Sequence, residues 1–245
     1  AMIEIFKEYT DQIEISIINP SGVRVGPVPE ILGPHRFRIC QTEILLYYGE
    51  PSPYSISQEI YIDLLPVESY LTEGIWRIVL SAGKIVTGQY EMWLPSDNVL
   101  NRGTGFLFPT DATTLTIPSS ASRAISVGAY AARTFAYADF SGRGFTRLTN
   151  MVKPDLVAPG VEVMTTTVGG GYAAFTGTSF ATPFVTGSAA LLMEWGIVRG
   201  NDPFLFGEKV KAYLKRGARP LPGMGVWPNR EMGWGRLCLA ESIPK

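Results

Sequence analysis

The stretch YAAFTGTSFATPFVTGSAALLMEWG, residues 172–196, decides the predicted fold. A glycine-bearing loop, Gly177-Thr178-Ser179, turns there into a segment, residues 180–197, that is apolar nearly all round and long enough for a core helix. We expect Ser179 in the first helical turn, where its backbone N–H has no intrahelical partner and the helix dipole reinforces binding of an oxyanion. The stretch therefore predicts a buried helix with a serine hydroxyl exposed at its start.

Two further features of this segment fit a helix that starts near the serine. Pro183 cannot donate to the carbonyl of Ser179 four residues back, which is tolerable at a helix start and costly in the interior. Small residues are expected to let the helix pack closely in the core: Ala181, Gly187, Ser188, Ala189 and Ala190. The plainer alternative is that Thr178 or Ser179 is an ordinary N-cap of an ordinary buried helix.

The rest of the second half alternates between strand-like and helix-like segments. AISVGAY (124–130) and DLVAPG (155–160) are short apolar runs typical of buried parallel strands. PFLFGEKVKAYLKRGA (203–218) is amphipathic and has a glycine stop. This alternation predicts an α/β layer architecture.

Residues 3–94 instead follow the pattern of short strands. QIEISIIN (12–19) alternates isoleucines with polar residues, and no segment has a helical period. The other strand-like segments are EILLYYG (43–49), SISQEIYIDLLP (55–66), GIWRIVLSAG (74–83) and TGQYEMWLP (87–95). The pattern predicts an antiparallel β-sandwich or jelly roll. A stretch rich in Pro, Gly, Asn, Asp and Thr follows, so the predicted domains are residues 1–105 and 106–245.

The amino-acid composition argues against some classes of binding partner. Lys plus Arg (21) nearly cancels Asp plus Glu (22), and no segment concentrates basic residues, so neither nucleic acid nor an anionic membrane is an expected partner. No apolar run in the sequence reaches about 20 residues, the length that spans a bilayer, so no membrane-spanning helix is expected. Cys40 and Cys238 have no metal-type or disulfide-framework spacing, and we expect two buried free thiols.

GTSFATPFVTGSAALL (177–192) resembles the serine motif of the subtilisin-like serine proteases, the subtilases, commonly written GTSMATPHVAGAAAL. Other segments resemble the family's motifs in the family's order: AISVGAYAARTFAYADFSGRG (124–144), KPDLVAPGVEVMTT (153–166) and MGWGRLCLAESI (232–243). The resemblance implies a partial subtilisin-like fold, hydrolysis of peptide bonds through an acyl-enzyme on Ser179, and the N–H of Ser179 as one of two oxyanion donors. Phe180 and Phe184 replace the usual Met and His, which affects packing more than chemistry.

The family's other catalytic motifs are absent from this sequence. Subtilases need an Asp in a D-[ST]-G turn, a His at the start of a helix and an Asn as the second oxyanion donor. The only histidine, His35, is followed by Arg and Phe and lies among β-type segments, which favours a loop or strand-edge histidine over a general base. Without a base the serine loses most of its catalysis. The chain alone is expected to be inactive: either it is the C-terminal part of a longer subtilase, whose N-terminal part supplies Asp, His and Asn, or it is a pseudoprotease that acts as a binding module.

The first half adds a second resemblance. TEGIWRIVLSAGKIVTGQYEMWLP (72–95) is similar to strands of the jelly-roll P domain of kexin-like subtilases. Its place ahead of the serine motif resembles the Csp-type subtilases of spore germination, in which a jelly roll is inserted into the catalytic domain. Such an insert acts as a structural clamp or as a substrate-docking domain. Localisation stays open, with a secreted or a spore-associated parent both compatible with the sequence.

The resemblance also implies partners and ligands. The substrate is expected to be a peptide or protein, and no cofactor is expected. Calcium is often bound by subtilases, and Asp155 falls where some members have a weak cation site, but a single acid at a strand end is usually solvated or hydrogen-bonded, so no metal ligand is predicted. Gly169, Gly170, Gly171 and Tyr172 are expected in a flexible loop beside the leaving-group side of the cleft. Apolar surface on half of a parallel sheet predicts that the isolated chain associates with itself, swaps elements or leaves part of its second half poorly ordered.

Overall fold

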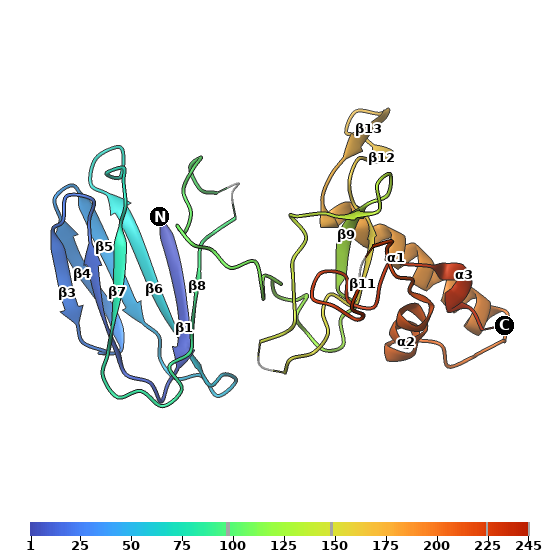
Figure 1. The fold of residues 1–245 in the computed structure, drawn as a ribbon, viewed down its shortest axis with the longest axis horizontal. Helices are drawn as coiled ribbons and strands as arrows, with labels where there is room; N and C mark the ends of the chain where they lie inside the picture. Colours follow the sequence, from blue (N-terminus) through green and yellow to red (C-terminus); the bar gives the residue numbers. More distant parts are fainter. Residues whose placement is uncertain (97–98, 148, 224, 245) are drawn as a thin grey trace. The chain divides into compact units, whose positions relative to one another are not determined.

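The computed structural model describes residues 1–96, 99–147, 149–223 and 225–244. The chain forms two compact units, Ala1–Pro109 and Thr110–Lys245 (Figure 1). The boundary predicted from the sequence lay after residue 105. Each unit is described below by itself.

The first unit consists of two antiparallel sheets (Figure 1). The larger sheet has the order β4-β5-β6-β1-β8, with β4 at Gly33–Ile39, β5 at Thr42–Tyr48, β6 at Ser57–Pro66, β1 at Met2–Glu8 and β8 at Tyr90–Trp93. The smaller sheet has the order β3-β2-β7, with β3 at Arg24–Val28, β2 at Ile13–Ile18 and β7 at Arg77–Ala82.

Alternating side chains make the core of this unit. In β2 the predicted alternation holds only in part: Ile13, Ile15 and Ile17 are buried and Glu14 is exposed, but Ser16, which the pattern placed among the polar positions, is fully buried. Residues from the inner faces of both sheets share one hydrophobic cluster. Burial on one face of each strand fixes the register, because a slip of one residue would move the isoleucines to solvent. The first half is thus all-β, as expected; its description as a jelly roll stays a prediction.

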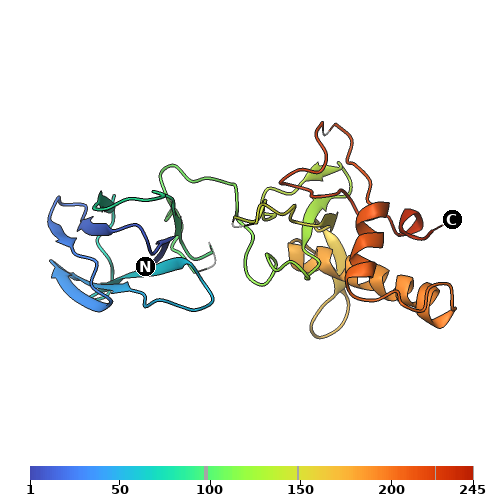
Figure 2. The same ribbon diagram turned by 90° about the horizontal axis from the view of Figure 1, so that it is seen from below.

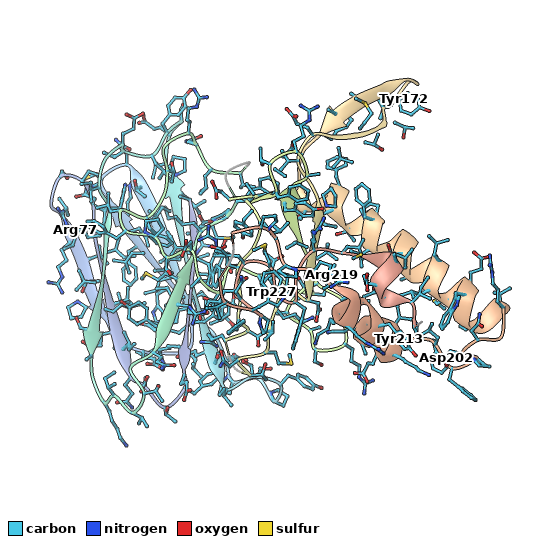
Figure 3. All side chains as sticks on the ribbon, turned by 45° about the vertical axis from the view of Figure 1, so that its right-hand side comes forward. Arg77, Tyr172, Asp202, Tyr213, Arg219 and Trp227 are labelled. Carbon is cyan, nitrogen blue, oxygen red and sulfur yellow. The ribbon has the colours of Figure 1, made fainter. Side chains whose placement is uncertain are left out.

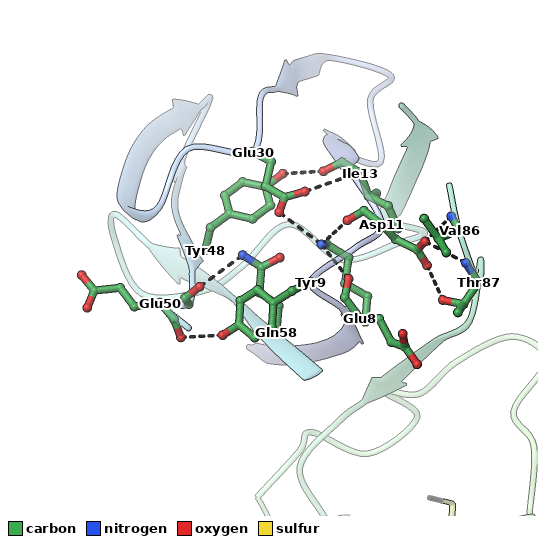
Figure 4. A network of polar contacts seen from close by, with 12 residues as sticks. Glu8, Tyr9, Asp11, Ile13, Glu30, Tyr48, Glu50, Gln58, Val86 and Thr87 are labelled. Carbon is green, nitrogen blue, oxygen red and sulfur yellow. Dashed lines mark hydrogen bonds and ion pairs between the residues drawn. The ribbon is translucent and has the colours of Figure 1, made fainter. Parts of the chain in front are cut away.

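A buried polar network closes one end of this unit (Figure 4). The ammonium of Lys7, fully buried, donates to the main-chain carbonyl of Asp11 and to Glu30 Oε1 at 3.2 Å. The carboxylate of Asp11 accepts hydrogen bonds from the N–H groups of Val86, Thr87 and Gly88 and from the Thr87 hydroxyl. The Val86 and Thr87 N–H groups hold the pKa of Asp11 well below its usual range, because they stabilise the charged form. The network ties the β1–β2 turn to the loop after β7.

The second unit holds a small mixed sheet and three α-helices among its described residues (Figure 2). The sheet has the order β10-β9-β11, with β10 at Ala136–Tyr137 antiparallel and β11 at Leu156–Pro159 parallel to β9 at Val127–Ala131. A separate hairpin joins β12, Val163–Thr166, to β13, Tyr172–Phe175. The helices are α1 at Thr178–Met193, continued by the π-helical segment η1 at Glu194–Val198, α2 at Glu208–Gly217 and α3 at Leu239–Ser242.

Helix α1 packs one face, and only one, against β9 and β11. Its buried residues are Ala181, Val185, Ser188 and Leu192, at helical spacing. The expectation of a helix buried all round is wrong: Phe184 is 43% and Leu191 52% exposed. Of the small residues, Gly187 and Ala190 also face outward, so only part of the small-residue set serves the core.

Two predictions made from composition need correction. The helical stretch Thr178–Val198 has 21 residues and contains an 18-residue window with a mean hydropathy of 1.2, so it is long and apolar enough to cross a membrane by length and composition, although no such run was expected. The stretch is this long and apolar because η1 directly continues α1 and no charged residue occurs in the helix before Glu194. Both cysteines are free, as expected, but neither is buried: Cys40 is exposed in the β4–β5 turn, at a φ of 51°, and Cys238 is half-buried.

Candidate functional site

Ser179 lies on the first turn of α1 and its side chain is exposed, as the sequence predicted. The residue before the helix is Gly177, at a φ of 155°, a backbone conformation that favours glycine. The alternative in which Thr178 or Ser179 caps the helix is wrong, since the N-cap position belongs to Gly177 and no side chain caps it. The serine is therefore free of a capping role.

Some polar groups at the start of α1 are hydrogen-bonded and others bond to no described residue. The N–H of Phe180 donates to the Gly177 carbonyl at 3.1 Å, whereas within the described residues neither the N–H nor the hydroxyl of Ser179 has a hydrogen-bond partner. Pro183, at the sixth helical position, cannot donate to the carbonyl of Ser179. An exposed N–H at the positive end of a sixteen-residue helix is suited to stabilise a negative oxygen.

Close backbone packing fixes the position of this turn. The N–H of Gly177 donates to the carbonyl of Gly160, directly after β11, at 2.8 Å. A Cβ added at Gly160 would lie 2.6 Å from the Cβ of Ala129 and 3.3 Å from that of Ala181. Gly160 is thus required by space, and it lets the start of α1 approach β9 and β11 directly.

The β12–β13 hairpin precedes the serine turn. It projects from the rest of its unit, and Tyr172, labelled in Figure 3, is 77% exposed on β13. Gly169, Gly170 and Gly171 all have positive φ and form the hairpin turn, so the predicted loop comprises the three glycines while Tyr172 belongs to a strand. At its base, the rings of Phe175 and Phe180 stack with centroids 5.3 Å apart. Phe180, one of the two departures from the family motif, therefore anchors the hairpin to α1.

A cavity of about 670 Å³ in this unit is lined in part by Thr178 and Thr182, which lie before and after Ser179 at the start of α1. Its remaining wall includes Leu115, Pro118, Ser126 and Ser141. The hydroxyl of Ser141 accepts the N–H of Ala129 at 2.9 Å, which ties the wall to β9. Sequence patterns gave no sign of this cavity, because its lining comes from segments that meet only in the fold.

The second unit contains no histidine. The only histidine of the sequence, His35, lies on β4, which is an edge strand of the larger sheet in the first unit. Its Nε2 is 2.7 Å from the Ile31 carbonyl and its ring stacks on Phe37 at 6.5 Å. The structure thus gives His35 the place of a strand-edge residue, the alternative that the sequence favoured over a general base.

The comparisons with known proteins begin with the family. A model of the subtilase family, Peptidase_S8, matches residues 77–235, more than half of the chain. The chain belongs to the subtilase family. The match covers the serine turn, β9, β11 and α1, which are the elements of the site.

Solved and curated relatives of this subtilase chain are proteases by name. The structure of the CspB protease of Clostridium perfringens has a TM-score of 0.90 and 36% identity, and covers 98% of this chain and 50% of that one. The serine protease AprX of Bacillus subtilis is 32% identical over 157 residues, 55% of this chain and 33% of AprX. The intracellular serine protease of Paenibacillus polymyxa is 38% identical over 77 residues, 29% of this chain and 24% of that protein. The chain therefore spans about half of the CspB chain and a third or less of these two curated relatives.

Proposed function

We propose that this chain carries the nucleophile of a serine endopeptidase, with Ser179 attacking the peptide carbonyl and forming an acyl-enzyme. The observation that carries the proposal is the exposed Ser179 on the first turn of α1, whose hydroxyl and N–H bond to none of the residues that the structure describes. The hydroxyl supplies the attacking oxygen, and the N–H is placed to stabilise the oxyanion of the tetrahedral intermediate.

The proposal includes a division of the catalytic groups. A serine hydroxyl needs a base within hydrogen-bond reach, and the second unit has no histidine to offer. We therefore propose that the His, the Asp and the second oxyanion donor come from polypeptide outside this sequence, namely the N-terminal part of the same protease. The chain by itself is then inactive, and its substrate is a peptide or protein.

Labelling by an active-site-directed fluorophosphonate tests this proposal. We expect no labelling of the present chain, because its serine is not activated, and labelling at Ser179 in the polypeptide encoded by the complete reading frame. The Ser179→Ala variant of the complete polypeptide is the control and is expected to lose the label. Rapid labelling of the present chain alone would show that its serine already has a base.

The second candidate function is a non-catalytic binding module. It is motivated by His35, whose ring is already bonded to Ile31 and stacked on Phe37 within the first unit. If the complete reading frame lacks an intact D-[ST]-G or H-G-[ST] motif, this candidate replaces the endopeptidase.

We also propose that residues 1–105 form a jelly-roll insert of the Csp type. Support comes from the two antiparallel sheets around one core and from similarity to the CspB protease over 98% of the chain. Its role is proposed to be a structural clamp, with substrate docking as the alternative. Removal of the insert from the complete protease distinguishes the two roles. If the insert is a clamp, its removal lowers the midpoint of thermal unfolding of the remaining domain. If it is a docking domain, its removal raises KM for a protein substrate and leaves KM for a short peptide unchanged.

A further inference from the structure

Three charged side chains form a buried cluster in the second unit, apart from the serine turn. The side chains of Lys153 and Asp155 are each 1% exposed and that of Lys211, on α2, is 13% exposed. The cluster carries two positive charges and one negative. Burial lowers the pKa of Lys153, and the ion pair with Asp155 opposes this shift.

The ammonium of Lys211 lies in a cage of oxygen atoms. It donates to the main-chain carbonyls of Ser122 at 2.7 Å and Ala124 at 2.9 Å, and its third contact is Asp155 Oδ1 at 3.0 Å. Main-chain carbonyls and a carboxylate are the ligands that hard cations take in proteins. An ammonium has three donors, so the three oxygens satisfy it completely.

The second lysine uses the remaining oxygens. Lys153 Nζ donates to the Ala124 carbonyl at 2.6 Å, to Ser126 Oγ at 3.0 Å and to Asp155 Oδ2 at 2.8 Å. Asp155 Oδ2 also accepts the N–H of Ser126 at 2.8 Å. Both carboxylate oxygens are therefore engaged, and a metal ion here would meet two ammonium groups of its own sign of charge. The residues present do not fit the weak cation site that some subtilases have in this region.

We infer that this chain carries its cation internally: the ammonium of Lys211, with Lys153 beside it, occupies the oxygen cage around Asp155 in place of a metal ion. The internal cation joins α2 to the segment 122–126 and to the start of β11. Ser126 bonds to Lys153 and Asp155, and Pro154 lies between these two residues in the sequence. Both Ser126 and Pro154 line the 670 Å³ cavity next to the serine turn. One wall of that cavity is thus fixed without dependence on calcium.

Thermal unfolding in matched salts tests the inference on the chain as it stands. The wild-type chain is expected to have the same Tm in potassium chloride, in choline chloride and with added millimolar calcium chloride. In choline chloride, Lys211→Ala is expected to have a lower Tm than the wild-type chain. In potassium chloride, part of this difference is expected to disappear, because potassium has the charge of the lost ammonium and a similar size. Potassium at one hundred times its Kd would raise the Tm of that variant by roughly 5–10 °C.

Lys209→Ala is the matched control, since Lys209 lies on the same helix, is 43% exposed and pairs with Asp202. Its Tm is expected to be equal in potassium and choline chloride. The inference is overturned if calcium or potassium stabilises the wild-type chain and Asp155→Asn abolishes the effect. It is also overturned if Lys211→Ala is as stable as Lys209→Ala, or if potassium restores nothing. Should Lys211→Ala fail to fold, the wild-type measurement with calcium and potassium decides alone.

Discussion

The amide of Gly177 donates to the carbonyl of Gly160 at 2.8 Å, so the turn that carries Ser179 is bonded directly to the end of β11. Neither residue has a side chain in the way, and α1 starts in contact with the sheet. The position of the serine is therefore set by backbone contacts within one unit.

Gly160→Ala is expected to destabilise the second unit by about 1–3 kcal/mol, because its Cβ would lie 2.6 Å from that of Ala129 and the start of α1 must move. Urea unfolding measures the change. Gly187→Ala is the control: a Cβ there meets no atom within 4 Å, and alanine in a helix interior is expected to raise stability by roughly 0.5–1 kcal/mol. Equal effects of the two substitutions would contradict the packing described for Gly160.

Ser179→Ala is expected to change the free energy of unfolding by less than about 0.5 kcal/mol, because the hydroxyl is exposed and bonds to no described residue. Ser141→Ala removes a hydroxyl of the same size from a residue that is 3% exposed, and it leaves the N–H of Ala129 without its acceptor. That loss is expected to cost about 1–3 kcal/mol. A large loss of stability in Ser179→Ala would show that the serine has a structural role.

Two adjacent leucines test the orientation of α1. Leu192 is fully buried in the core of the second unit, and Leu192→Ala is expected to cost about 2–5 kcal/mol. Leu191 is 52% exposed, and Leu191→Ala is expected to cost less than about 1 kcal/mol. Urea unfolding of both variants checks the difference, and a reversed order would mean that the helix is rotated about its axis.

Asp11→Asn is expected to destabilise the first unit at neutral pH, with an effect that fades in acid. The lowered pKa of Asp11 means that its contribution is fully present above the unfolded value of about 3.9 and is lost as pH falls through the folded pKa. Urea unfolding at a series of pH values measures the difference from wild type. Glu73→Gln, which removes a carboxylate from an exposed position, is the control. A difference that stays constant down to low pH would show that the charge of Asp11 is not what stabilises the turn.

Local pattern was enough to predict much of this fold. The alternation in β2, the apolar runs of β9 and β11 and the glycine before α1 each have a one-dimensional signature, and the structure places the corresponding elements there. The serine motif was found in the same way. β3 was not singled out because RVGPV contains glycine and proline, residues that argue against a central strand; the structure places β3 at a sheet edge, where proline is tolerated.

Long-range pairing could not be predicted from pattern. The sequence showed Asp155 as a single acid at a strand end, and its two ammonium partners were not apparent because Lys211 reaches it from a helix that follows α1. The exposed face of α1 was missed for a related reason: a helix that is apolar all round carries no periodic signal to say which side meets the sheet. The role of Asp11 likewise depends on a loop that follows β7.

The bond between Gly160 and Gly177 also makes residues 161–176 a closed loop whose two ends are held by the body of the unit. Closure entropy changes only slowly with loop length, and this hairpin projects into solvent, so residues can be added or removed at its tip with little effect on where Ser179 lies. The region beside the serine is then free to diverge in length and sequence between related proteins while Ser179 keeps its place. In the proposed endopeptidase, substrate preference and the geometry of attack could thus evolve separately.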